Sequence, residues 1–172
     1  AEEFTQQAGR TAASFADKFW NPQTRCLFDV LSDEDVGDAS IRPNQLLAVS
    51  LPFSPLPENL QQQVVAVCQK KLLTPMGLRT LAPDAPAYHG YCVGDQRTRD
   101  IAYHQGTAWP WLMGPFVSAY VKVNGSNAAA RAQAGAFLQP FADHLHQYGL
   151  GSICEIADGN APHTPRGCPF QA

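Results

Sequence analysis

The sequence is poor in charge: only 16% of its 172 residues are Asp, Glu, Lys or Arg, against roughly 25% in most soluble domains. The net charge is −3 and the basic residues are scattered, so the basic surface of a nucleic-acid-binding protein is missing. No apolar run approaches the roughly 20 residues that cross a bilayer, and no signal peptide pattern is present. We therefore expect no nucleic-acid or membrane partner, and a neutral polymer such as carbohydrate fits better.

The five cysteines follow no standard pattern. They are odd in number and widely spaced, which favours free thiols in a reducing compartment and hence a cytoplasmic location. A zinc site could draw on His89, Cys92, His104 and Cys154 or Cys168, but these spacings match no finger motif. No glycine-rich phosphate loop with its Lys-Ser/Thr pair is present either. We expect no metal and no cofactor.

Hydrophobic periodicity predicts a helical chain of one domain, long enough to bury a core. The expected helices cover residues 3–20, 43–51, 58–71, 107–123 and 127–148. Thr107 is the expected N-cap of the fourth helix, and Gly149 the stop after the last. Residues 25–31 could form a short strand, residues 32–40 read as an acidic loop, and residues 74–100 as a long irregular stretch. The prediction is an all-α domain with at most short strands and with its site in the loops.

Two carboxylates, Glu155 and Asp158, lie close together near the end of the sequence. Glycoside hydrolysis uses two carboxylates on opposite sides of the scissile bond. Residues three apart in a strand-turn segment cannot serve as both unless the turn splays them widely, so one of them could be half of such a pair. The alternative is that Glu155 is a surface acid and Asp158-Gly159 an ordinary turn.

Residues 103–111 place polar side chains directly before two tryptophans. His104 and Gln105 can bind sugar hydroxyls, while Trp109 and Trp111 offer flat faces to the C–H side of a sugar ring. In the alternative interpretation both tryptophans belong to the core and the His-Gln pair caps a helix.

Two further segments could bind a ligand. Residues 88–95, which include Tyr91, alternate aromatics with glycine and could form the wall of a saccharide subsite or simply a packed loop. Residues 41–46, which include Asn44, gather Arg, Asn and Gln at a helix start. Those groups could hold substrate or brace neighbouring loops, and bracing is the favoured interpretation.

Four motifs occur in one order: Arg42-Pro43-Asn44-Gln45, Leu73-Thr74-Pro75-Met76-Gly77-Leu78-Arg79-Thr80-Leu81, Tyr103-His104-Gln105-Gly106-Thr107-Ala108-Trp109-Pro110-Trp111, and Glu155-Ile156-Ala157-Asp158-Gly159 with Arg166-Gly167-Cys168. Together they resemble the C-terminal part of the glycogen debranching enzymes, specifically their amylo-α-1,6-glucosidase domain. The resemblance covers residues 15–172.

The resemblance implies the C-terminal half of an (α/α)6 toroid that hydrolyses the α-1,6-linked glucosyl stub of glycogen. Glu155 would be the general base of an inverting mechanism. The glucose subsite would be lined by His104, Gln105, Trp109 and Trp111, with Tyr91 and Asn44 as further binding candidates. Asp158 and Arg166 would hold the loop in shape.

The family's general acid is expected in a Trp-Met-Asp-type motif, which this sequence does not contain. Residues 1–172 are therefore expected to form a single-domain fragment of the catalytic domain, inactive by itself. Half a toroid would leave apolar helix faces exposed, which favours self-association. Two alternatives stay open: a non-catalytic glucan-binding module, and a glycosidase of other linkage specificity on the same toroid.

Overall fold

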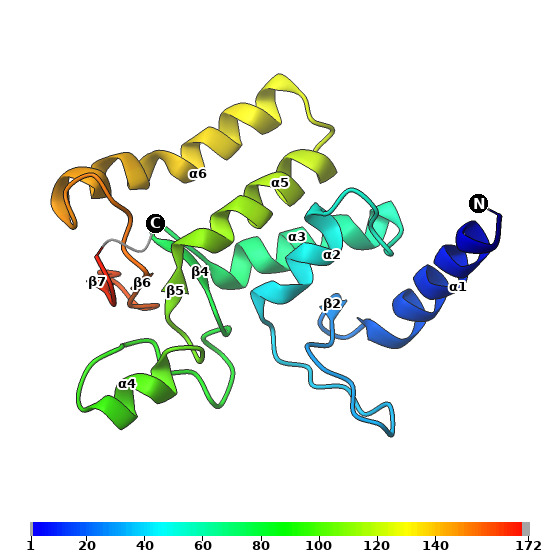
Figure 1. Cartoon of the computed structure of the whole chain (residues 1–172), viewed down its shortest axis with the longest axis horizontal. Coiled ribbons are helices and arrows are strands. Elements are labelled where there is room, and N and C mark those ends of the chain that lie inside the picture. Colours follow the sequence, from blue (N-terminus) through cyan, green and yellow to red (C-terminus); the bar gives the residue numbers. More distant parts are fainter. Residues whose placement is uncertain (1, 170–172) are drawn as a thin grey trace.

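The computed structural model describes residues 2–169, and about half of them are helical (Figure 1). The α-helices are α1 (Glu2–Phe19), α2 (Leu47–Ser50), α3 (Glu58–Leu72), α4 (Gln96–Ala102), α5 (Met113–Val123) and α6 (Ala128–Gln147). Two 3-10 turns, Pro43–Leu46 and Pro110–Leu112, lead directly into α2 and α5. The chain is thus mostly α, as expected, while the toroid stays a prediction.

Most of the expected helices are confirmed. The periodic apolar residues of α1 and α3 form helices with nearly the expected ends, and Asn127 caps α6 by accepting from the Ala130 backbone N–H at 2.9 Å. The prediction that Thr107 is an N-cap is wrong. Thr107 does not cap a helix: the chain first runs through strand β5 (Ala108–Trp109), and α5 begins only at Met113.

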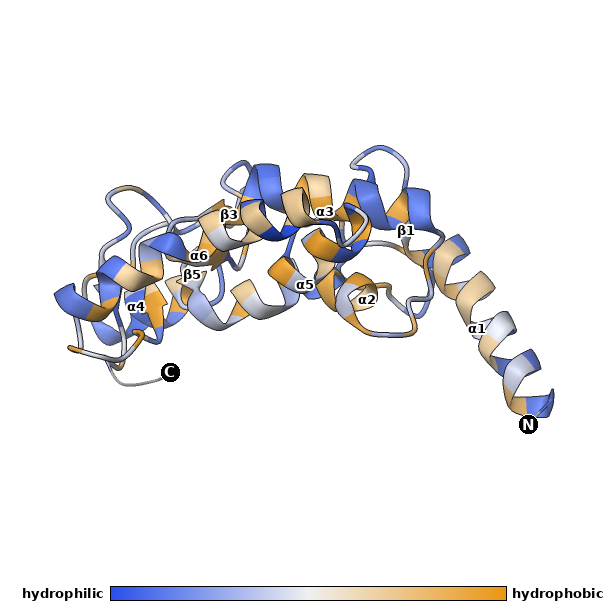
Figure 2. Ribbon diagram, turned by 90° about the horizontal axis from the view of Figure 1, so that it is seen from above, coloured by the Kyte–Doolittle hydropathy of each residue, from blue (hydrophilic) through white to orange (hydrophobic). Residues whose placement is uncertain are grey.

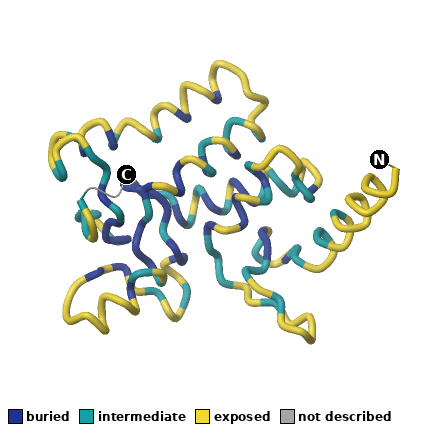
Figure 3. The backbone as a smooth tube through the Cα atoms, in the orientation of Figure 1, coloured by how far each residue is buried: buried dark blue, intermediate teal, exposed yellow. Residues whose placement is uncertain are grey.

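The core is formed by α3 and α5, with α2 and α6 packed around them. Phe116 of α5 is fully buried and contacts Phe137 of α6 with ring centroids 5.4 Å apart. Figure 3 shows the same distribution: the buried segments run through α3, α5 and the strands, whereas the outer face of α6 is exposed.

The short strands form more structure than the sequence indicated. Five of them make an antiparallel sheet in chain order, namely β3 (Leu73–Thr74), β4 (Gly77–Arg79), β5 (Ala108–Trp109), β6 (Ile156–Ala157) and β7 (Pro165–Arg166). A separate hairpin pairs β1 (Trp20–Asn21) with β2 (Cys26–Leu27). Residues 74–100 were expected to be irregular throughout, and this is wrong in part, because they contain β4 and most of α4.

Helix α1 projects from the rest of the molecule and buries none of its residues (Figure 2). Beside its C-terminal half lies an apolar cleft of about 380 Å³, walled by Phe15, Phe19, Leu51 and Phe53. Phe53 is 95% exposed, which is unusual for so large an apolar side chain. Within residues 2–169, no helix is long and apolar enough to cross a membrane.

Candidate active site

The five-stranded sheet brings three of the four sequence motifs together. Strand β5 lies between β4 and β6, with Ala108 opposite Arg79 on one side and opposite Ala157 on the other. Strand β7 follows β6, with Ile156 opposite Arg166. Segments that are tens of residues apart in the sequence are therefore neighbours in one sheet. Backbone pairing fixes which residues lie opposite one another.

Glu155 immediately precedes β6, and both oxygens of its carboxylate accept hydrogen bonds. The Tyr103 hydroxyl donates to Oε1, and the Cys168 backbone N–H donates to Oε2 at 3.0 Å. The Glu155 backbone N–H in turn donates to the Cys168 carbonyl at 2.9 Å. Gly167 has φ +66°, and any Cβ there would collide with Glu155 Oε2, so the turn can approach the carboxylate only as glycine.

Tyr103, whose hydroxyl bonds to this carboxylate, belongs to a cluster of three aromatic rings. His104 and Trp109 stack with centroids 5.1 Å apart and planes inclined by 14°, and Tyr103 meets both rings edge-on. Burial, followed by the bond to Glu155, raises the pKa of Tyr103 to about 12. The Tyr103 phenol therefore stays protonated at neutral pH and acts as a donor.

Asp158 is 1% exposed and joins three segments. Its Oδ2 accepts from Arg166 Nη2 at 2.9 Å and from Nε at 3.1 Å, while Oδ1 accepts from the Cys92 backbone N–H at 2.9 Å. The bond to Asp158 is the main cause that raises the pKa of Arg166. The arrangement fixes the loop at residue 92 against β6 and β7.

Arg42 braces the opposite side of the site. Its guanidinium donates to the His104 carbonyl at 2.8 Å and to Gln105 Oε1 at 2.6 Å, and it pairs with Asp29 at 3.2 Å. Asn44 Nδ2 donates to the same Asp29 at 3.1 Å. These contacts agree with the bracing interpretation of residues 41–46.

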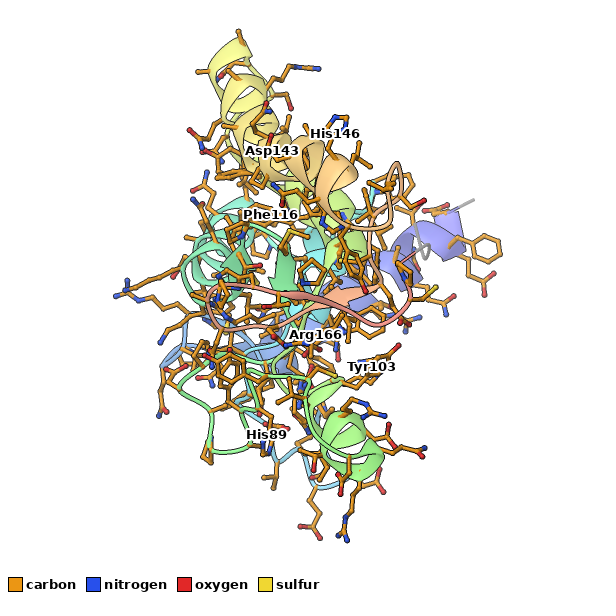
Figure 4. All side chains as sticks on the ribbon, turned by 90° about the vertical axis from the view of Figure 1, so that its left-hand side faces the viewer. His89, Tyr103, Phe116, Asp143, His146 and Arg166 are labelled. Carbon is orange, nitrogen blue, oxygen red and sulfur yellow. The ribbon has the colours of Figure 1, made fainter. Side chains whose placement is uncertain are left out.

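The other two candidates for binding are exposed. Trp111 is 57% exposed on the 3-10 turn that precedes α5, and Tyr91 is 49% exposed with its hydroxyl 3.4 Å from the Ala161 carbonyl. A cleft of about 440 Å³ lies next to the Glu155 region and is lined in part by Tyr103, Arg166 and Gly167. Figure 4 shows Tyr103 and Arg166 on this side of the molecule, apart from His146 on α6.

Tyr103 and Gly167 both lie within the sequence motifs but carry no predicted role there, and Asp29 belongs to none of the motifs. Gly167 offered a usable signal, since a glycine between Arg166 and Cys168 suggests a turn with φ above zero. Asp29 offered none, because its partners are known only once the chain is folded.

The segment that presents Glu155 is also attached to α6. His144 is 2% exposed, and its Nε2 accepts from the Cys154 backbone N–H at 3.1 Å. Burial lowers the pKa of His144 below its ordinary value of 6.5, so the folded chain keeps this ring neutral. The unfolded chain binds a proton near pH 6.5, whereas the folded chain does so only at lower pH. The free energy of unfolding should therefore be highest above pH 6.5 and fall as the pH drops below it.

Urea unfolding between pH 7.5 and 5 tests this prediction. We expect His144→Gln to reduce the loss of stability at low pH, because the amide oxygen can still accept from the Cys154 N–H but does not titrate. The variant His146→Gln changes an exposed histidine two residues away. Its stability should fall with decreasing pH as much as that of the parent chain. A free energy of unfolding of the parent chain that stays constant between pH 7.5 and 5 would contradict the prediction.

All five cysteines are free, and only Cys168 is exposed. Among the described residues, no group of three or more His, Cys, Asp or Glu side chains is placed to hold a metal ion. At the site itself, the Glu155 carboxylate is held by two hydrogen-bond donors, one of which belongs to an aromatic cluster.

Comparison with known proteins agrees with the motifs. A family model described as amylo-alpha-1,6-glucosidase matches residues 1–172. The glycogen debranching enzyme of Saccharomyces cerevisiae is 32% identical over 90 residues, which represent 48% of this chain and 6% of that protein. The chain therefore matches only a small part of the length of this curated relative.

Proposed function

Because this chain belongs to the amylo-α-1,6-glucosidase family, a family of glycoside hydrolases, we propose that it forms part of an enzyme that debranches glycogen. The bond to be hydrolysed is the α-1,6 linkage of a glucosyl stub. The single observation that carries the proposal is the carboxylate of Glu155. It is held by two donors from different segments, and one of them, Tyr103, contacts the stacked rings of His104 and Trp109.

Glu155 is the general base in this proposal. Its carboxylate takes a proton from a water molecule as the water oxygen bonds to the anomeric carbon, on the face opposite the leaving group. The bond from the anomeric carbon to O6 of the glucan breaks, and that oxygen receives its proton from a general acid outside these 172 residues. One water is consumed, and the configuration at the anomeric carbon is inverted.

The aromatic and polar side chains would bind the glucosyl unit. Trp111 and Tyr91 expose ring surface, and the stacked His104 and Trp109 form a rigid wall close to Tyr103. Gln105 has its amide nitrogen left to donate, because Arg42 engages only its oxygen.

Asn44 is the weakest of the binding candidates. Its amide already donates to Asp29, so it would contribute to binding mainly by holding that carboxylate and its partner Arg42 in place.

The proposed reaction is tested with the full-length enzyme on a limit dextrin carrying single α-1,6-linked glucosyl stubs. We expect release of free glucose, with the β-anomer appearing first in proton NMR spectra recorded before mutarotation. Linear maltooligosaccharides, which contain only α-1,4 linkages, are the matched control and should not be cleaved.

Four results would contradict parts of the proposal. First-formed α-glucose would exclude inversion, and cleavage of the linear control would exclude the linkage. Glucose release by the isolated 172-residue chain would mean that the general acid lies within it. If the chain bound maltooligosaccharides but removal of Glu155 left turnover of the full-length enzyme unchanged, the alternative of a non-catalytic glucan-binding module would be favoured.

Self-association and cytoplasmic location stay predictions. The exposed apolar side chains at the cleft beside α1, among them Phe53 and Leu51, support the first. The free state of the five cysteines supports the second.

A further inference from the structure

We propose that Tyr103 is a positioning residue that holds the Glu155 carboxylate in the orientation needed to take a proton from water. The inference rests on the proposed role of Glu155 as general base. It adds a second residue, from a different part of the chain, on which the base depends.

The contact itself is specific. Tyr103 donates its hydroxyl proton to Glu155 Oε1, while the backbone N–H of Cys168 donates to Oε2 at 3.0 Å. Two donors from opposite sides fix the rotation of the carboxylate about its terminal bond. Each carboxylate oxygen has more than one acceptor position, so a water molecule can still bind.

Tyr103 is in turn held firmly. Its carbonyl accepts from the Thr107 hydroxyl at 2.6 Å and from Trp109 Nε1 at 3.0 Å. Its ring meets Trp109 with centroids 4.9 Å apart and His104 at 4.8 Å, both edge-on. A side chain fixed by backbone and ring contacts orients its partner without losing further conformational freedom during the reaction.

The location also favours a functional role over a purely structural one. Tyr103 lines the cleft of about 440 Å³ together with Arg166 and Gly167, and Gly167 is the glycine that lets the turn approach Glu155. Tyr103 therefore contacts both this cleft and the half-buried Glu155 carboxylate, which is not itself among the lining residues. A hydrogen bond to a charged acceptor is about twice as strong as a neutral one, which makes this contact a strong constraint.

Tyr103→Phe in the full-length enzyme tests the inference, because it removes the hydroxyl and keeps the ring. We expect kcat on the limit dextrin to fall by about 10- to 100-fold, with KM within about twofold of the parent. A residue that only stabilises the fold would not lower kcat while leaving KM unchanged.

Tyr120→Phe is the matched control. Tyr120 packs against Phe116 and Phe137 in the helical core, and its substitution should leave kcat and KM at parental values. Circular dichroism and thermal melting of both variants check that the fold is kept.

The double variant Tyr103→Phe/Glu155→Gln separates this inference from the proposed function. If Tyr103 acts through Glu155, its substitution causes no further loss of kcat in the Glu155→Gln background. A parental kcat for Tyr103→Phe, or the same fold-loss in both backgrounds, would overturn the inference while leaving Glu155 as the base. Parental turnover of Glu155→Gln alone would instead overturn the proposed function.

Discussion

Glu155→Gln is expected to lower kcat on α-1,6-glucosyl limit dextrin by roughly 10²–10⁴-fold in the full-length enzyme. The amide has nearly the size of the carboxylate but cannot accept the proton of the attacking water. It also carries hydrogens on one side, so one of the two donors that hold Glu155, Tyr103 or the Cys168 N–H, loses its acceptor. KM should change little, because the proposed glucosyl contacts come from other residues.

Two comparisons make this result interpretable. Glu58→Gln is the same chemical change at an exposed position in the first turn of α3, and it should leave turnover unchanged. Azide needs no base to attack the anomeric carbon, so it should restore turnover of the Glu155→Gln enzyme and give β-glucosyl azide. Turnover of Glu155→Gln within a few-fold of the parent would refute the role of Glu155.

Asp158→Ala is expected to destabilise the chain by about 3 kcal/mol, at the low end of the range for a broken buried ion pair. The carboxylate is 1% exposed and accepts from Arg166 and from the Cys92 N–H, and both lose their acceptor. The loss stays at the low end because the Arg166 side chain is 34% exposed and can turn to water. Asp158→Asn should cost less, since its amide oxygen can still accept from Cys92.

Urea unfolding followed by tryptophan fluorescence measures these differences. Asp84→Ala removes an ion pair as well, to Lys71 at 2.6 Å, but the Asp84 side chain is 61% exposed. A surface pair contributes at most about 1 kcal/mol, so this control should stay close to the parent. Equal effects of Asp158→Ala and Asp84→Ala would mean that Asp158 does not join the three segments as proposed.

Much of the helical structure could be predicted from the sequence, because its causes are local. The apolar spacing in α1 and α3 and the stop at Gly149 act over a few residues, and the helices follow them. The prediction for Thr107 was wrong because it, too, used only local sequence. Thr107 has the chemistry of an N-cap, but its hydroxyl donates to the Tyr103 carbonyl four residues earlier, and the chain continues as a strand.

The site divides in the same way. The residue types of Glu155, Asp158, His104 and Trp109 are visible in the sequence, and the order of the motifs was enough to identify the family. Their mutual geometry is not visible, because two- and three-residue strands carry no periodic signal of their own. They exist only because strand β5 finds β4 on one side and β6 on the other.

The sequence by itself therefore determined most of the helices, which depend on local spacing, and the family, whose motifs occur in one order. The catalytic role of Glu155 is implied by the family resemblance and stays a proposal. Only the tertiary structure decided that Tyr103 and the Cys168 N–H hold Glu155, and that Arg42 holds Gln105. Those hydrogen bonds join residues 13 to 63 positions apart. Such contacts form when the whole chain packs, and no local pattern specifies them in advance.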